Sequence, residues 1–170
     1  MLRNILSPET CAKCRICCIF DKYDVWETPV VSAELYEKIH AARPELKFVS
    51  KGDSGAYIFN MEETWDSERE LFICPALDPD KGCTLGDNKP FDCKIWPYRI
   101  MEFNGVRVIS VASICPDMYA KPLNKLVGEL ENGLADKIFA EADKDPAMIK
   151  PYEQGYPILK VELQGRKECK

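Results

Sequence analysis

Residues 98–112 read YRIMEFNGVRVISVA, two runs of β-branched and aromatic residues on either side of Asn104-Gly105. An Asn-Gly pair favours a two-residue turn because both residues adopt positive φ angles easily. The stretch therefore predicts a β-hairpin with strands over 98–103 and 106–112. Segments of similar composition predict further strands at 46–50, 55–61, 70–74 and within 157–163.

Hydrophobic periodicity predicts two helices around this hairpin. The first covers residues 30–43, where Ser32 is a suitable N-cap and apolar residues recur four positions apart. The second carries an amphipathic stripe formed by Leu123, Leu126, Val127, Leu130, Leu134 and Ile138. Gly133 weakens its middle, and the helix is expected to end before Asp145-Pro146. The order of elements predicts an α+β fold with a short antiparallel sheet, a few helices and cysteine-rich loops.

Length and charge narrow the class of protein. The chain has 170 residues, 46% of them hydrophobic, which suits one soluble domain. Its 23 Lys and Arg against 28 Asp and Glu give a net charge of −5, so it offers no basic footprint for nucleic acid. The N-terminal residues carry no apolar signal segment, and the longest apolar stretch, 106–115, is too short to span a bilayer. We expect a cytoplasmic protein with no nucleic-acid or membrane partner, and the sequence indicates no particular protein partner.

Cysteine is the unusual part of the composition, with nine residues against one histidine. Four of them form the run Cys11-x2-Cys14-x2-Cys17-Cys18, and the others follow singly as Cys74, Cys83, Cys93, Cys115 and Cys169. The cytosol keeps thiols reduced, and an odd number fits a closed disulfide framework poorly. Charged spacers separate the first four cysteines, which argues against simple core packing for them.

Metal binding explains this spacing. Two-residue spacers let neighbouring sulfurs converge on one ion, as in zinc sites. Three thiolates at that spacing plus a remote Cys-Pro are also the bacterial pattern for an iron–sulfur cluster, and the chain has two such candidates, Cys74-Pro75 and Cys115-Pro116. The sequence therefore favours an iron–sulfur cluster over zinc as the bound cofactor.

Cys17 and Cys18 are adjacent, which raises a question of geometry. Neighbouring side chains point to opposite faces of a strand and diverge by about 100° on a helix. Both thiols would hold one ion only on an irregular backbone, so the simpler expectation is that they serve different centres or that one is spare. The sequence leaves two arrangements open. The cysteines form either two centres of four thiolates each, or one centre with the remaining cysteines reactive or structural.

The cysteine motifs resemble those of a known family. The run Cys11-x2-Cys14-x2-Cys17-Cys18 is followed by Cys74-Pro-Ala-Leu, Gly82-Cys83-x-Leu85, Lys89-Pro90-x-x-Cys93-Lys94 and Pro97. This order resembles the CxxCxxCC (YkgJ-like cysteine cluster) family of zinc- or iron-chelating proteins. The resemblance implies eight metal ligands: Cys11, Cys14, Cys17, Cys18, Cys74, Cys83, Cys93 and Cys115. It implies one metal-binding domain over 1–170, with a cysteine-rich core at 11–116 and a C-terminal helix and strand at 117–170.

The chain departs from the family pattern at three positions. Lys89 and Lys94 stand where arginine is usual, so a bidentate guanidinium contact is lost there, and Gly86 replaces a common tyrosine. None of these is a thiol, so the expected metal ligands are unaffected. The family also includes flagellin lysine methylases, but those proteins are longer, and the resemblance does not imply that this chain transfers methyl groups.

Two functions of different classes follow from the cysteines. The first is a metal-binding module that stores, delivers or senses the metal. The second is an iron–sulfur-dependent redox or protein-modifying enzyme that keeps one iron position open; a thiol oxidoreductase is the weaker alternative. Phosphate-binding loops, nucleophile elbows and His-Glu-x-x-His motifs are absent from the sequence, and His40 is expected to be structural. Trp96-Pro97-Tyr98 suits either a dry shell around a centre or plain core packing.

Overall fold

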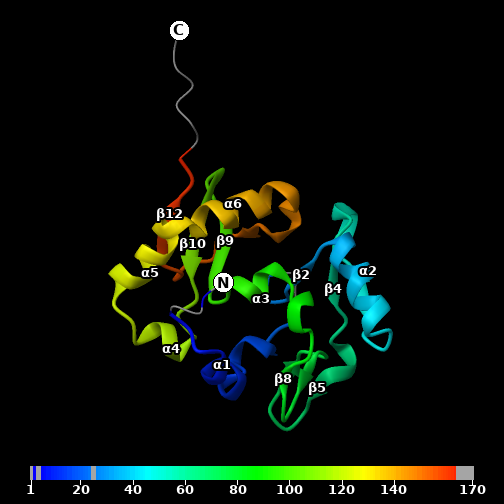
Figure 1. Ribbon diagram of the computed structural model, residues 1–170. Coiled ribbons are helices and arrows are strands. Elements are labelled where there is room, and N and C mark those ends of the chain that lie inside the picture. The colour runs from blue at the N-terminus through cyan, green and yellow to red at the C-terminus, as the bar shows by residue number, and fades with distance from the viewer. Residues whose placement is uncertain (1, 3–4, 24–25, 164–170) are drawn as a thin grey trace.

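The predicted hairpin forms the middle of the largest sheet in the computed structural model, which describes residues 2, 5–23 and 26–163 (Figure 1). Strand β9 (Tyr98–Phe103) pairs antiparallel with β10 (Val106–Val111). The turn between them has positive φ angles, 51° at Asn104 and 77° at Gly105, as the sequence predicts. The hairpin prediction is therefore confirmed.

Two further strands complete this sheet in the order β11-β9-β10-β12. Strand β12 (Ile158–Val161), which is antiparallel to β10, confirms the strand predicted within 157–163. Strand β11 (Lys150–Pro151) runs parallel to β9, so the sheet is not purely antiparallel as expected. A parallel neighbour needs a long crossover, and the helices between β10 and β11 supply it.

Three smaller sheets are built from short strands. Strands β3 (Phe48–Ser50), β4 (Tyr57–Phe59) and β6 (Leu71–Ile73) confirm the segments predicted at 46–50, 55–61 and 70–74. Each strand is shorter than expected, because turns and 3₁₀ helices flank it. One sheet has the order β2 (Val30–Val31), β4 (Tyr57–Phe59), β3 (Phe48–Ser50), and another β1 (Ile19–Phe20), β6 (Leu71–Ile73), β5 (Trp65–Asp66). The last pairs β7 (Leu77–Asp78) with β8 (Gly82–Cys83).

The first predicted helix is α2 (Ala33–Ala42), which begins later than expected. The hydroxyl of Ser32 accepts a hydrogen bond from the amide of Leu35 at 3.3 Å, so Ser32 is the N-cap, and the residues before it form β2.

The second predicted helix is broken into α5 (Leu123–Glu129), a π-helical turn η5 (Leu130–Leu134) and α6 (Ala135–Lys144). Gly133 has a φ of 93° at the break. The remaining α-helices are α1 (Pro8–Cys14), α3 (Phe91–Ile95) and α4 (Pro116–Tyr119). The 3₁₀ helices are η1 (Ile16–Cys18), η2 (Gly52–Ser54), η3 (Glu62–Thr64), η4 (Gly86–Asn88) and η6 (Pro146–Met148).

The buried side chains form two hydrophobic clusters. The sheet core lies between the largest sheet and the C-terminal helices, and includes Tyr98, Ile109 and Ile138. The α2 core includes Ile39 and Phe59. In Figure 1 the two groups of elements lie on opposite sides of the molecule, with α1 and α3 between them. Within the described residues, no helix combines the length and the apolar character that a membrane span requires.

Candidate functional site

Eight cysteines fall within the described residues, and most lie on short helices rather than in the expected loops. Cys11 and Cys14 are on α1, Cys17 and Cys18 on η1, and Cys93 on α3; Cys83 is in β8, Cys74 follows β6 and Cys115 caps α4. Helix α1 was missed by periodicity, yet Ser7-Pro8 signals its start, because the Ser7 hydroxyl accepts a hydrogen bond from the Thr10 amide at 3.4 Å. All eight are free thiols, and Cys169 lies outside the described residues.

The first thiol group consists of Cys11, Cys14, Cys17 and Cys115. These four cysteines line one small cavity of about 30 Å³ together with Trp96. Burial raises the pKa of Cys11, and the neighbouring thiols of Cys17, Cys115 and Cys14 raise it further. Burial also raises the pKa of Cys115, although the backbone amides of Met118 and Asp117 partly offset the change. The first group therefore joins the start of the chain to a cysteine about a hundred residues later.

The second thiol group consists of Cys18, Cys74, Cys83 and Cys93. The amide of Cys74 donates a hydrogen bond of 2.8 Å to the carbonyl of Cys18, which fixes these two segments side by side. The contact with the Cys17 thiol lowers the pKa of Cys18, but Cys74 and burial outweigh it and raise that pKa to about 12. Burial raises the pKa of Cys93, and the nearby Asp92 and the thiols of Cys17, Cys18 and Cys83 add to the shift.

The two groups meet at Cys17 and Cys18, whose sulfur atoms are 3.9 Å apart. These adjacent side chains do not diverge as they would on a regular strand or helix. Arg15 has a φ of 59°, and η1 follows it as a tight 3₁₀ turn. This is the irregular backbone that the sequence argument required for the two thiols to face the same side.

A larger cavity of about 450 Å³ opens beside both groups. Its lining includes five thiols and four cationic side chains: Cys11, Cys17, Cys18, Cys83, Cys93, Arg15, Lys81, Lys89 and Lys94. The contact with Cys18 raises the pKa of Cys17 above its ordinary value, while the ammonium group of Lys89 acts in the opposite direction. In this lining the cationic side chains outnumber the one carboxylate, Asp87, so the surroundings favour thiolates.

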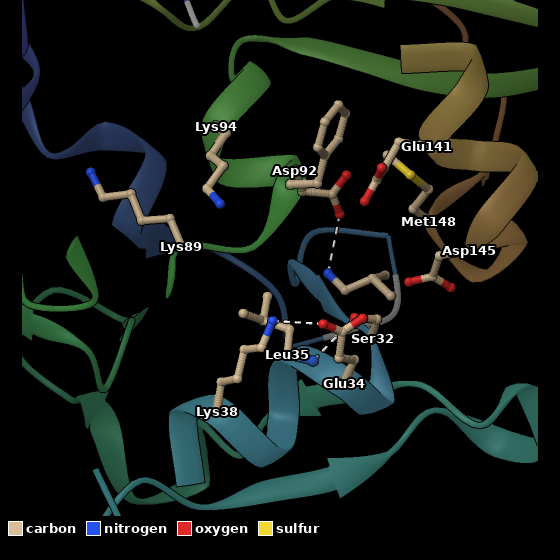
Figure 2. Close-up of a pocket in the computed structure, with 12 residues that line it drawn as sticks. Ser32, Glu34, Leu35, Lys38, Lys89, Asp92, Lys94, Glu141, Asp145 and Met148 are labelled. Carbon is tan, nitrogen blue, oxygen red and sulfur yellow. Dashed lines mark hydrogen bonds and ion pairs between the residues drawn. The ribbon is translucent and has the colours of Figure 1, made fainter. Parts of the chain in front are cut away.

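A second, charged cavity of about 180 Å³ lies next to it and shares Lys89 and Lys94 with it. In Figure 2, Lys89 and Lys94 lie on one side of this space, and Glu141 and Asp145 lie on the other. Asp92 lies between them, where its carboxylate accepts a hydrogen bond from the Val30 amide at 3.1 Å. The thiol-lined cavity therefore adjoins a second cavity that is lined by charged side chains.

Arg99 lines a small cavity together with Cys17 and Cys93, and no sequence motif predicts its contact with Trp26. The guanidinium carbon of Arg99 is 4.9 Å from the ring centre of Trp26 and 4.8 Å from that of Trp96. Only the fold brings Trp26 from the N-terminal part to strand β9. His40, in contrast, is exposed and stacks on Tyr36 at 5.5 Å.

The thiols are gathered but not arranged as a finished coordination sphere. In the described part of the chain, no group of three or more His, Cys, Asp or Glu side chains is arranged so that it could hold a metal ion. The chain matches no protein-family model, and neither a curated protein nor a solved structure is detectably similar to it.

Proposed function

We propose that the protein binds metal through cysteine thiolates, with the first and second thiol groups each supplying the ligands of one centre. The observation that carries this proposal is the convergence of seven thiols, drawn from residues 11 to 115, onto two adjoining cavities. The eighth thiol, Cys74, lies beside Cys18, because the Cys74 amide donates a hydrogen bond to the Cys18 carbonyl. Cys74 and Cys115 belong to the hydrophobic cores, but cysteines that served only as core residues would be scattered along the cores rather than grouped with other thiols. The resemblance of the motifs to the CxxCxxCC family supports the same function.

The spacing of the first group favours an iron–sulfur cluster over a single zinc ion. The four cysteines that line its cavity are the run Cys11-x2-Cys14-x2-Cys17 and the remote Cys115-Pro116, which is the arrangement of bacterial cluster ligands. A cluster also needs more room than one ion, and the adjoining cavity of about 450 Å³ offers it. Binding would displace the protons of these thiols, because the thiolate is the metal ligand.

The charged cavity favours one alternative, an iron–sulfur-dependent enzyme. Lys89 and Lys94 line both cavities, and carboxylates line the charged one as well, so a small substrate with both cationic and anionic groups would bind across the two cavities next to the thiols. Such an enzyme keeps one iron position free of protein sulfur. An added small thiol that changes the electron paramagnetic resonance spectrum of the reduced cluster would show a vacant iron position. A thiol oxidoreductase is less well supported. The pKa values of Cys11 and Cys18 are raised, and a thiol that stays protonated is a poor nucleophile.

The first test is metal analysis of protein purified without oxygen. We expect stoichiometric iron and acid-labile sulfide, with a broad visible absorption that disappears on chelation. Colourless protein with stoichiometric zinc would support metal binding but would show that the bound cofactor is zinc rather than an iron–sulfur cluster. Protein that contains no metal, and whose thiols all react with a thiol reagent, would contradict the proposal.

Serine substitutions test the assignment to two centres. Cys11→Ser and Cys74→Ser should each remove about half of the bound metal, and the double variant should remove nearly all of it, because each change breaks one group. Cys169→Ser is the matched control and should leave the metal content unchanged, since this residue is outside the motif. If one of the two single variants retained the full metal content, the two-centre assignment would be wrong.

A further inference from the structure

The thiol-lined cavity of about 450 Å³ concentrates positive charge in a chain whose net charge is −5. Its lining contains one carboxylate, Asp87, and four cationic side chains: Arg15, Lys81, Lys89 and Lys94. Among the residues that the structure describes, none of these four cations forms an ion pair, since the ion pairs that are present use other lysines and arginines. The cavity therefore holds cations that the described protein does not neutralise.

The carboxylates of the adjoining charged cavity do not serve these cations. Lys89 and Lys94 line that cavity as well, but in Figure 2 they lie on the side opposite to Glu141 and Asp145. Three of its four carboxylates form ion pairs with other lysines: Glu34 with Lys38 at 2.6 Å, Glu141 with Lys144 at 3.1 Å and Asp92 with Lys150 at 3.8 Å. Lys89 and Lys94 thus remain available to a ligand.

Three of the four cations are partly withdrawn from water. Arg15, Lys89 and Lys94 are half-buried, whereas Lys81 is exposed. The Nε of Arg15 donates a hydrogen bond of 2.9 Å to the carbonyl of Ala12, which orients the side chain and leaves its terminal nitrogen atoms as donors for another group. Withdrawing a charged group from water is costly unless an opposite charge compensates for it. A bound anion would supply that compensation.

The cavity also has the size and the mixed lining of a small-molecule site. Pockets for small molecules measure roughly 300–1,000 Å³ and combine apolar walls with a few polar groups. Here the apolar part of the lining comes from Leu2, Leu6, Leu77 and Trp96. The cations come from separate elements, because Arg15 follows α1, Lys81 precedes β8 and Lys94 lies on α3. Charges placed in this way suit a ligand with more than one anionic group on a carbon skeleton.

We propose that the thiol-lined cavity binds a small organic molecule with two or more carboxylate or phosphate groups, which Arg15, Lys89 and Lys94 hold. The terminal nitrogen atoms of a guanidinium group pair with two oxygen atoms of such a group, and each lysine ammonium acts as a point charge on it. The apolar side chains then contact the carbon skeleton. This inference is independent of metal binding, because it uses the cationic and apolar parts of the lining rather than the thiols.

The test is calorimetric titration of the full-length protein, without oxygen and at low salt, with two probes. Propane-1,2,3-tricarboxylate carries only carboxylates and fructose 1,6-bisphosphate only phosphates, so the tighter binding probe identifies the anionic group. We expect at least one probe to bind, and added salt to weaken its binding. The double variant Lys89→Met/Lys94→Met should bind that probe at least about 10-fold more weakly, because each lost ammonium removes a charge-assisted hydrogen bond.

Lys13→Met is the matched control. It removes an exposed cation of α1 that does not line the cavity, so it should leave the affinity unchanged. Lys81→Met, which changes an exposed side chain of the lining, gives a second comparison if the double variant does not fold.

Three results would overturn the inference: neither probe binds to the wild type, the double variant binds as tightly as the wild type, or Lys13→Met weakens binding as much as the double variant does. The last result would show that only the general surface charge attracts the probe. Protein that contains no metal and still binds a probe in the expected way would contradict the proposed function and support this inference.

Discussion

Lys150 and Asp92 form a buried ion pair next to the second thiol group. Lys150 is 1% exposed, and its ammonium donates a hydrogen bond of 3.1 Å to the carbonyl of Thr28 and lies 3.8 Å from the carboxylate of Asp92. Burial lowers the pKa of Lys150 to about 8, while Asp92 raises it and so favours the charged form. Because Asp92 precedes Cys93 on α3, this pair ties strand β11 to a helix that carries a thiol.

Removal of the lysine tests how much this pair stabilises the fold. Lys150→Met should lower the free energy of unfolding by about 3–5 kcal/mol, since it leaves the carboxylate of Asp92 buried without its cation. Urea denaturation at pH 7 measures the change. Lys125→Met, on the exposed surface of α5, is the control and should change stability by less than about 0.5 kcal/mol. A Lys150→Met protein as stable as the wild type would show that the pair contributes nothing.

At the scale of elements, the break between α5 and α6 is the clearest departure from a pattern in the sequence. The apolar stripe continues across it, since Leu130, Leu134 and Ile138 are all buried in the sheet core. The backbone does not continue as a regular helix, because Gly133 has a φ of 93° and Asn132 a ψ of 24°. Glycine adopts positive φ without strain, whereas other residues do not. The glycine is therefore required by the break rather than merely tolerated in a helix.

Alanine substitutions distinguish these two roles of glycine. If residue 133 were in a regular helix, Gly133→Ala would stabilise the protein by up to about 1 kcal/mol. The positive φ instead predicts a destabilisation of about 1–2 kcal/mol, although open space surrounds the position. Gly128→Ala is the matched control in α5, where nothing lies within 4 Å of an added Cβ and the φ is not positive, and it should increase stability. Thermal unfolding of both variants shows whether each substitution raises or lowers the stability of the protein.

At the scale of the whole molecule, the thiols connect two hydrophobic cores. Cys11 and Cys115 belong to or pack against the sheet core, whereas Cys18, Cys74 and Cys83 belong to or pack against the α2 core. Figure 1 shows α1, which starts the cysteine run, between the two halves of the molecule. Metal bound at the meeting point of Cys17 and Cys18 would therefore stabilise both halves together.

Metal binding should raise the stability of the whole chain. A metal present at 100 times its dissociation constant adds about 2.7 kcal/mol to the free energy of unfolding. The gain should be smaller at pH 6 than at pH 8, because protons compete with the metal for thiols whose pKa values are already raised by burial and by neighbouring thiols. Thermal unfolding without oxygen, with and without added Zn²⁺ at both pH values, measures this. A melting temperature that does not respond to the metal at pH 8 would contradict the expectation.

The sequence by itself determined the elements that depend on neighbouring residues. Asn104-Gly105 sets the hairpin turn, and Ser32 sets the start of α2, because a two-residue turn or an N-cap is decided within a few residues of the chain. The spacing of the cysteines likewise predicts which thiols would bind metal, and this stays a prediction. It left open whether they act as one centre or two, since spacing does not say which distant thiols meet.

Only the tertiary structure decided how the thiols are grouped. Cys14 and Cys115 share a cavity because α1 and α4 both lie against it, and the parallel strand β11 pairs with β9 through a long crossover. The contact between Arg99 and Trp26 has no signal in the sequence, because the two residues come from distant parts of the chain. Such contacts arise from the packing of whole elements against the two cores, and no local preference encodes them.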